Sequence, residues 1–340
     1  MKWLAVSLFV VFFINFYAKA SETSFEMVFG SCLNQRGDLS IMDEVLGENA
    51  SYFISLGDMP YSAYGESNPM GALQIAFDEL EKTNFFPQLF EKFKVLGMWD
   101  DHDYGLNDGG RENPIQDKAQ DAYLRLFRTN PQDKRFQRKG LYHEELVETK
   151  DGKQIQILML DSRSFRSKLE KDPAAGGKRR YRPSQSQNQE MLGSEQWDWL
   201  KLKLKKSVDL RIVVSSIQVL AKDHGFEKWW NLPIERDRLL NLLAKNHGKE
   251  KTIILSGDRH YSSFYKQNLS GGMKLYELTS SGLNKTVPRK YWGKEKDRYH
   301  VSGKKRIFTH SYGTLKYRAN GSLTLEIKSK AGRVLESLSI

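Results

Sequence analysis

Short apolar runs recur along this chain, and each is followed directly by small, acidic or histidine residues. The runs are rich in β-branched and large apolar residues and show little alternation, which is typical of strands buried on both faces. Ligands of open α/β sheets bind outside the carboxyl ends of the strands, so the residues after each run are candidates for a site. The predicted strands are residues 51–56, 93–99, 154–160, 211–217 and 251–256.

Amphipathic helical patterns lie between these runs. The stretch 71–93 predicts two helices broken at Pro87, and Ser194 is a candidate N-cap for another. Pro233 stands where a first-turn proline is expected. Strands that alternate with helices indicate an α/β layered sandwich. The other predicted helices are residues 115–127, 193–206 and 233–246.

The last part of the chain changes character and predicts strands only. Residues 319–321, Ala-Asn-Gly, are a good hairpin turn. We interpret this region as a second sheet or an antiparallel extension of the first, and not as a separable domain. Its predicted strands are residues 274–281, 306–313, 314–319, 322–329 and 334–340.

One long polar stretch, residues 166–190, has no regular pattern. A solvated loop is the default interpretation, and a mobile arm that faces the substrate is the alternative.

The first twenty residues have the pattern of a signal peptide. Lys2 precedes an apolar core over 3–18, and Ala18-Lys19-Ala20 is a small-x-small cleavage site. A membrane anchor is the alternative, but the apolar run is shorter than the ~20 residues of a span. We therefore predict a signal peptide over 1–20 and one domain over 21–340, in a protein that is secreted, either periplasmic or extracellular, without a transmembrane anchor after cleavage.

The charge of the predicted mature chain is positive. Without Lys2 and Lys19 it has 51 basic residues against 42 acidic ones. This excess suits an anionic substrate or surface. The basic residues are scattered and no nucleic-acid-binding motif is present, so the positive charge does not indicate a nucleic acid as the partner.

Cys32 is the one cysteine of the chain. It therefore has no disulfide partner within the chain, although an exported protein meets oxidising conditions in which disulfides form. Free cysteines are usually small buried hydrophobes, which is one interpretation. The other is a thiolate that binds a metal ion, which requires further ligand-type residues at similar places.

Such residues follow the predicted strands. A carboxylate such as Asp58 can bridge two cations, and Tyr61 is close enough in the chain to reach the same ion. Phenolate and thiolate together favour an oxidised metal such as ferric iron. Carboxylates and the amide of Gln218 suit Ca²⁺, Mg²⁺ or Mn²⁺. The residues just past the strand ends are Cys32, Asp58, Tyr61, Asp100, Asp101, His102, Asp258 and His260.

Five sequence blocks in this order resemble the PhoD-like alkaline phosphatase family of metallophosphoesterases. The resemblance covers residues from about 25 to 285. It implies two mixed β-sheets flanked by helices, with a C-terminal antiparallel strand extension. The blocks are FGSC (29–32), GDMPY (57–61), WDDHD (99–103), LDSR (160–163) and SGDRHYS (256–262).

The resemblance also implies a ligand set. Cys32, Asp58, Tyr61 and His260 would hold Fe³⁺, with Asp58 as the bridge. Asp101 and Asp258 would hold the second ion, which is Ca²⁺ in this family, with Mn²⁺, Mg²⁺ or Zn²⁺ as alternatives. Gln218 fits the family's penultimate ligand block only loosely.

From these residues we expect a metal-dependent hydrolase in which a metal-bridging hydroxide attacks phosphorus in line. No G-x-S-x-G elbow is present, which disfavours serine-hydrolase chemistry. We expect His102 to protonate the leaving oxygen or to hydrogen-bond the phosphate. We expect Arg163 to neutralise phosphate charge, with an ion pair as the alternative. Arg259 is left outside the predicted site because its side chain could point away.

The expected substrate is a phosphomonoester or a phosphodiester, as a small molecule or a phospholipid. The alternatives are a phosphodiesterase or phospholipase-type activity at the same site, and a non-catalytic protein that binds phosphoesters on this fold. The sequence carries no signal for the oligomeric state.

Overall fold

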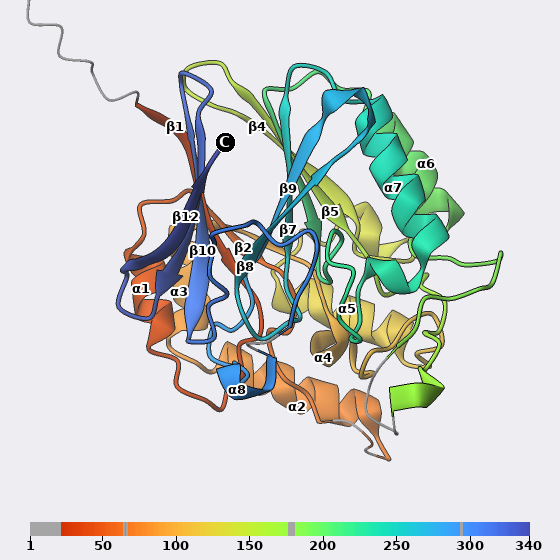
Figure 1. Ribbon diagram of the computed structural model, residues 1–340. Coiled ribbons are helices and arrows are strands. Elements are labelled where there is room, and N and C mark those ends of the chain that lie inside the picture. Colours follow the sequence, from red (N-terminus) through yellow and green to blue (C-terminus); the bar gives the residue numbers. More distant parts are fainter. Residues whose placement is uncertain (1–21, 64, 66, 176–180, 293–294) are drawn as a thin grey trace, which may run out of the picture.

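The computed structural model describes residues 22–340 except 64, 66, 176–180 and 293–294. These residues form two six-stranded mixed sheets flanked by helices (Figure 1), which confirms the predicted fold class. The predicted signal peptide, residues 1–20, lies outside the described residues, so the division of the chain into a signal peptide and one domain stays a prediction. Within the described part, no helix has the length and apolar character needed to cross a membrane.

The first sheet combines the N-terminal strands with the last strands of the chain. Strand β1 lies parallel to β2 and antiparallel to β10, so the C-terminal strands extend the sheet that the N-terminus begins. This is the predicted antiparallel extension. The order is β12-β11-β10-β1-β2-β3, with β1 Thr23–Gly30, β2 Tyr52–Ser55, β3 Lys94–Gly97, β10 Ser311–Arg318, β11 Leu323–Ser329 and β12 Val334–Ser339.

The second sheet has a parallel centre and antiparallel edges. Strands β5, β6, β7 and β9 run parallel, while β4 and β8 pair antiparallel at the two edges. The order is β4-β5-β6-β7-β9-β8, with β4 His143–Glu148, β5 Gln154–Leu160, β6 Leu210–Ser215, β7 Lys251–Ser256, β8 Ser263–Asn268 and β9 Lys274–Thr279.

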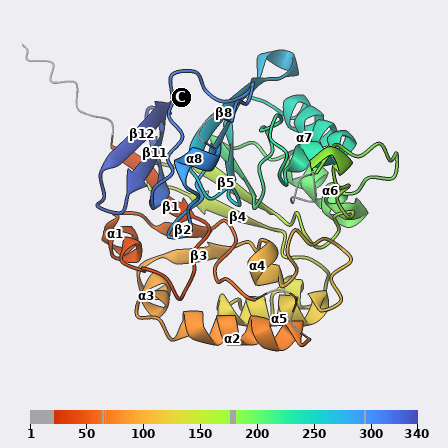
Figure 2. The ribbon, with the colours of Figure 1, turned by 60° about the horizontal axis from the view of Figure 1, so that its bottom comes forward.

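Alternate residues of the second sheet enter two different cores. Ile157 and Met159 of β5 join the core that lies between the sheets, whereas Leu158 and Leu160 join the core under α6 and α7. Both faces are thus covered, which explains the continuous apolar runs. Figure 2 shows α1, α2, α3 and α5 along one side of the molecule. The helices are α1 Ile41–Gly47, α2 Pro69–Glu81, α3 Phe85–Lys92, α4 Asp101–Tyr104, α5 Gln116–Leu126, α6 Gly193–Lys203, α7 Pro233–Lys245 and α8 Arg289–Trp292.

Two local predictions are wrong. The helical stretch 71–93 breaks over residues 82–84 and not at Pro87, which lies in the first turn of α3. A first-turn proline costs no hydrogen bond because the amides there have no partner within the helix. Ser194 is not the N-cap of α6, since the helix begins at Gly193 with Leu192 before it.

The region 306–319 also differs from the prediction. It holds one strand, β10, and not two consecutive strands. Gly313 lies inside this strand, opposite Phe29 of β1. A Cβ atom at Gly313 would lie 2.2 Å from Cε2 of the Phe29 ring. The glycine is thus needed for the close approach of a large buried ring and does not mark a strand end.

We predict that Gly313→Ala destabilises the protein. The added methyl group must displace the buried Phe29 ring, and overpacking of this kind costs about 1–3 kcal/mol. The free energy of unfolding in urea measures the effect. Gly47→Ala at the end of α1 is the matched control, because no atom lies within 4 Å of its added Cβ. Equal stability of the two variants would contradict the packing argument.

Candidate metal centre

The carboxyl ends of the two sheets are joined at one point. Ser31 follows β1 and forms an isolated parallel bridge with Ser281, which follows β9. The Ser31 amide donates a hydrogen bond to the carbonyl of Ser280 over 3.1 Å. The loops that leave the strand ends of both sheets are therefore held side by side. Cys32 comes from the loop after β1 of the first sheet. His260 comes from the loop after β7 of the second sheet.

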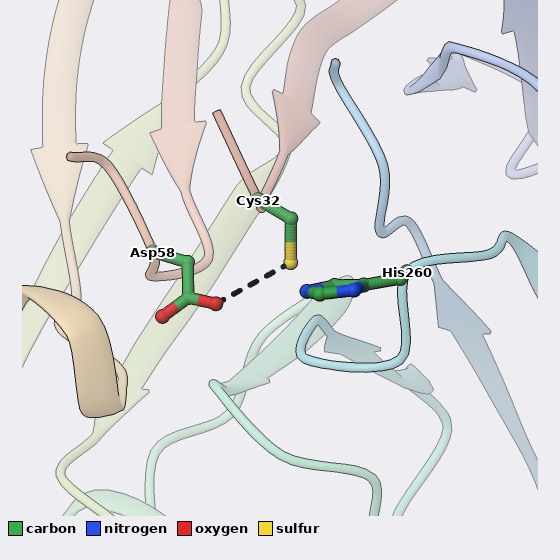
Figure 3. Close-up of side chains that lie close together, drawn as sticks. All are labelled: Cys32, Asp58 and His260. Atoms are coloured by element: carbon green, nitrogen blue, oxygen red, sulfur yellow. Dashed lines mark hydrogen bonds between the residues drawn. The ribbon is translucent and has the colours of Figure 1, made fainter. Parts of the chain in front are cut away.

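One group of ligand-type atoms comprises Cys32, Asp58 and His260 (Figure 3). One candidate atom from each lies within 4.8 Å of the others. The Cys32 Sγ lies 3.6 Å from Asp58 Oδ2. The Tyr61 hydroxyl donates to Asp58 Oδ2 over 3.0 Å and lies 2.9 Å from His260 Nε2. The structure thus brings together the four residues expected to hold iron.

A second group comprises Asp58, Asp101 and His102, whose candidate atoms also lie within 4.8 Å of one another. The backbone amide of His102 donates to Asp58 Oδ1 over 3.1 Å. Asp58 therefore belongs to both groups. Its Oδ2 lies near Cys32 and Tyr61, and its Oδ1 accepts from the His102 backbone amide. Asp258 belongs to neither group but lines the same cavity, which has a volume of about 170 Å³.

The backbone at these residues is unusual. Cys32, Asp58, Asp258 and His260 all have positive φ, at 62°, 54°, 68° and 56°. This left-handed region is costly for side chains other than glycine, and such strain collects at functional sites. Gly57 precedes Asp58 at φ 102°, and a Cβ there would lie 2.4 Å from Asp100 Cβ. The tight turn after β2 thus places Asp58 against the loop after β3.

The carboxylates of the site repel one another in a buried setting. Burial raises the pKa of Asp58 well above the usual carboxyl value, and the charge of Asp101 raises it further. Burial and the nearby Asp100 do the same for Asp258. Asp101 differs, because His102 and Arg163 lower its pKa to about 2 although burial opposes them. A bound cation would relieve this repulsion, so the donor set fits metal ions.

The other ligand-type residues agree with this interpretation. Burial raises the pKa of the Cys32 thiol to about 11, so a thiolate here needs a cation beside it. Burial, followed by the Asp58 charge, raises the pKa of Tyr61 well above its usual value. Burial lowers the pKa of His260 to about 4, which leaves its imidazole in the neutral form that binds metals.

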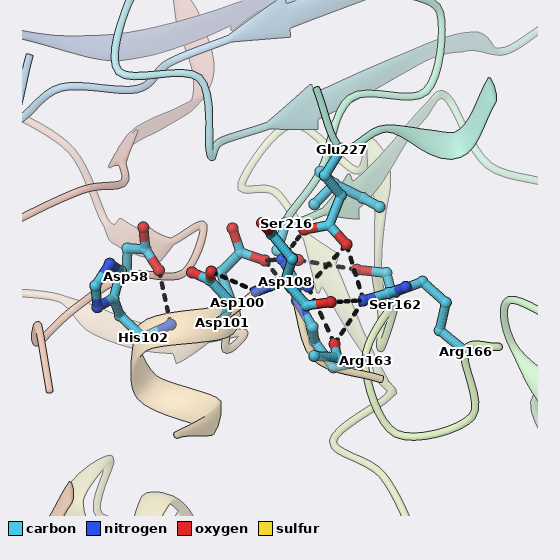
Figure 4. A network of polar contacts seen from close by, with 12 residues as sticks. Asp58, Asp100, Asp101, His102, Asp108, Ser162, Arg163, Arg166, Ser216 and Glu227 are labelled. Carbon is cyan, nitrogen blue, oxygen red and sulfur yellow. Dashed lines mark hydrogen bonds and ion pairs between the residues drawn. The ribbon is translucent and has the colours of Figure 1, made fainter. Parts of the chain in front are cut away.

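Arg163 does not line the cavity, which differs from the predicted contact with a substrate phosphate. Its guanidinium is fully buried (Figure 4). Nε donates to Asp100 Oδ1 over 2.8 Å, and Nη1 donates to Glu227 Oε1 over 2.9 Å and to the carbonyl of Gly109 over 3.1 Å. Arg163 thus forms ion pairs with Asp100 and Glu227, which is the alternative that the sequence left open, and these pairs are buried.

Gln218 is also absent from the cavity lining. Its Nε2 donates to Thr279 Oγ1 over 2.8 Å, and its Oε1 lies 3.0 Å from Nε2 of His224. Both ends of the amide are therefore engaged by protein groups. Four predicted site residues are not part of the cavity lining: Cys32, Tyr61, Arg163 and Gln218. Cys32 and Tyr61 still contact the lining residue Asp58, whereas Arg163 and Gln218 lie apart from the group of predicted ligands.

Sequence reasoning missed several cavity residues. The irregular stretch 166–190 is more than a solvated loop, because Tyr181 reaches the cavity and donates to Asp108 Oδ2 over 2.8 Å. Arg259 lines the cavity between two predicted ligands, and that position in the sequence was the one available signal. The missed lining residues are Asn107, Asp108, Tyr181, Phe226, Glu227 and Arg259.

Comparison with known proteins gives a family and a fold. The sequence model of the family described as PhoD-like phosphatase matches residues 79–334, which is most of the chain. No curated protein matches the chain.

Three solved structures illustrate the fold. The structure of PhoD has a TM-score of 0.71 at 15% identity and covers 94% of this chain and 73% of that one. GAP50, described as the anchor in the inner membrane complex of Plasmodium, has a TM-score of 0.57 at 10% identity, with 94% and 89% covered. Purple acid phosphatase PPD1 from yellow lupin (Lupinus luteus) seeds has a TM-score of 0.58 at 11% identity, with 93% and 53% covered. At these identities the likeness shows the fold alone.

We predict that Arg163→Met strongly destabilises the protein. The change leaves the buried carboxylate of Asp100 without the cation that pairs with it and leaves Glu227 with Arg166 alone, and a broken buried pair costs about 3–5 kcal/mol. Urea unfolding measures the loss. The control is Arg125→Met on α5, which breaks an exposed pair with Asp121 and should leave the unfolding midpoint unchanged. If both variants unfold like the wild type, the network does not support the fold.

Proposed function

The chain belongs to the PhoD-like phosphatase family, and on this premise we propose that it hydrolyses phosphoric esters with a dinuclear metal centre. The family makes the chain a hydrolase of the phosphatase or phosphodiesterase type. The observation that carries the proposal is the position of Asp58, whose carboxylate belongs to both groups of ligand-type atoms. A shared carboxylate is what a pair of neighbouring cations requires.

The donor chemistry supports different metals at the two positions. Cys32, Tyr61 and His260 would join Asp58 in holding Fe³⁺, since phenolate and thiolate favour an oxidised ion. Asp101 and Asp258 would join Asp58 in holding Ca²⁺, because they offer carboxylate oxygens. Gln218 would first have to release His224, so its role as a ligand stays a prediction from the sequence.

When bound, the two ions would lower the pKa of a water for in-line attack on phosphorus and neutralise the phosphoryl charge. The chain itself supplies the proton for the leaving oxygen. His102 lines the cavity, and its Nδ1 lies 3.3 Å from the carbonyl oxygen of Ser62. A carbonyl only accepts, so Nδ1 carries a proton, and in the imidazolium form the proton on Nε2 would pass to the leaving oxygen.

The imidazole of His102 is also fixed in position. Its ring lies against the ring of Tyr61, with 3.9 Å between the centroids. The backbone amide of His102 donates to Asp58, and its carbonyl accepts a hydrogen bond from the Ser62 hydroxyl over 2.5 Å. A ring that lies against Tyr61 and is attached to a fixed backbone needs little reorganisation before proton transfer.

We further propose that the protein is exported and acts outside the cytoplasm. The support is the predicted signal peptide over 1–20. The substrate would be a phosphomonoester or a phosphodiester, including a small molecule or a phospholipid.

The first prediction of this proposal concerns the metal ions. Purified protein should hydrolyse p-nitrophenyl phosphate, bis(p-nitrophenyl) phosphate or both, and dialysis against EDTA should abolish the activity. Resupply of Fe³⁺ and Ca²⁺ should restore it, whereas a sample dialysed without EDTA keeps it throughout. If neither ester is cleaved with both metals supplied, the proposed function is wrong.

The second prediction concerns Cys32. Cys32→Ser should remove the bound iron and the visible absorption of a tyrosinate–iron pair. It should also lower activity by more than about a hundredfold, because residues that only support metal ligands already cost up to that amount when they are changed. Metal analysis, absorption spectra and turnover measure these losses.

Ser280→Ala is the matched control for Cys32→Ser, because the Ser280 hydroxyl donates to the Phe29 carbonyl and contacts no predicted ligand. It should keep iron and activity. Full iron and full activity in Cys32→Ser would show that this cysteine is a core residue. A colourless wild-type protein that contains only zinc would overturn the iron assignment.

A further inference from the structure

The lining of the cavity is strongly acidic. Among the residues that the structure describes, Arg259 is the only arginine or lysine in this lining. A phosphoester that enters the cavity is an anion, and the charge of bound cations would be shared between the substrate and the carboxylates next to them. The single guanidinium is therefore the part of the protein wall that attracts the substrate. The acidic lining residues are Asp58, Asp101, Asp108, Glu227 and Asp258.

Arg259 lies between Asp258 and His260 in a tight turn. Its backbone amide donates to the carbonyl of Gly257 over 2.9 Å, and the residues on both sides have positive φ. This turn directs the ligand-type side chain on each side of Arg259 to the cavity. Arg259 is thus attached to the same rigid loop as the proposed metal ligands, and its position relative to them is fixed.

The guanidinium is supported on its aromatic faces and at one tip. Its Cζ lies 4.7 Å from the ring centroid of Phe226 and 5.2 Å from that of Tyr261. Nη2 forms an ion pair with Glu295 Oε2 over 3.0 Å. Only 2% of the residue is exposed. A guanidinium held in this way loses little conformational entropy when it binds, and its planar fork matches two phosphate oxygens.

The charge of the substrate determines how much this guanidinium contributes. Near and above neutral pH a phosphomonoester carries close to two negative charges, because the second pKa of such a phosphate is about 6. A phosphodiester lacks that second ionisable oxygen and carries one charge. In a buried site the attraction of a fixed cation grows with the charge of its partner. Arg259 should therefore favour the monoester.

From this geometry we propose that Arg259 binds a non-bridging phosphate oxygen of the substrate and favours phosphomonoester dianions over phosphodiester monoanions. This inference rests on the proposed function, and it names the substrate class that the site prefers. Arg259 contacts the substrate and leaves the ion pair with Glu295 in place as its support.

The test compares Arg259→Gln with Arg259→Lys and Glu295→Gln. Arg259→Gln should lower kcat/KM for p-nitrophenyl phosphate by about ten- to a hundredfold, the loss of a hydrogen bond to a charged group, and should lower it less for bis(p-nitrophenyl) phosphate. Arg259→Lys keeps the charge without the fork and should fall between Arg259→Gln and the wild type. Calorimetry with inorganic phosphate should show the same order of affinities.

Glu295→Gln separates substrate binding from a structural role. It breaks the same ion pair but keeps the guanidinium, so it should retain the preference for the monoester and most of the phosphate affinity. If it reproduces the losses of Arg259→Gln, Arg259 acts only as a structural brace and the inference is overturned. Equal losses on the two esters in Arg259→Gln overturn it as well. Unfolding curves of all variants identify any loss that comes from misfolding. If Arg259→Gln does not fold, the comparison of the two esters is made with Arg259→Lys instead.

The calorimetric arm keeps this inference distinct from the proposed function. A wild-type protein that binds inorganic phosphate through Arg259 but cleaves neither ester would contradict the hydrolase and retain the phosphate site. A protein that cleaves esters while Arg259→Gln binds phosphate as tightly as the wild type would contradict this inference alone.

Discussion

The repulsion among buried carboxylates at the junction of the two sheets is the constraint on which the rest of the site depends. Asp58 and Asp101 are 2% and 6% exposed, and Asp100 is fully buried. Charges in such a place need compensation, because the interior screens them far less than water does. The structure meets this need partly with arginines. Burial, followed by the charge of Asp101, raises the pKa of Asp58, so further cations would stabilise its carboxylate.

Neither sheet could hold this site alone. The first sheet supplies Cys32 and Asp58 from the ends of β1 and β2, while the second supplies His260 from the loop after β7. The bridge between Ser31 and Ser281 aligns these ends, and the Ser281 hydroxyl lies 3.1 Å from Cys32 Sγ. The same contact that joins the sheets therefore orients the sulfur. The C-terminal strands matter indirectly, because β10 pairs with β1 and covers its outer edge.

The sequence predicts the residues that follow strands, because a strand and the loop after it are neighbours in the chain. Cys32, Asp58 and His260 could be found in this way. Tyr181 could not, since its place at the cavity depends on a hydrogen bond from its amide to the carbonyl of Gly225 in a distant loop. The helix break before Pro87 was misplaced because a proline is equally compatible with a helix start, and only packing decides between the two.

The two arginines near the cavity show why residue type alone did not reveal their roles. Arg163 follows a strand, yet its donors are engaged by Asp100, Glu227 and a carbonyl, and Arg163 itself does not line the cavity. Arg259 stands between two ligand-type residues and was left out of the site, yet it lines the cavity. The difference comes from the acidic partners. Asp100 and Glu227 enclose the first guanidinium on the buried side of the site, so its charge serves to keep those carboxylates in place. The second has Glu295 at one tip and aromatic rings beside it, which hold it at the wall. Arg163 therefore stabilises the buried carboxylates, whereas Arg259 is held in the cavity lining, where an anionic substrate would enter.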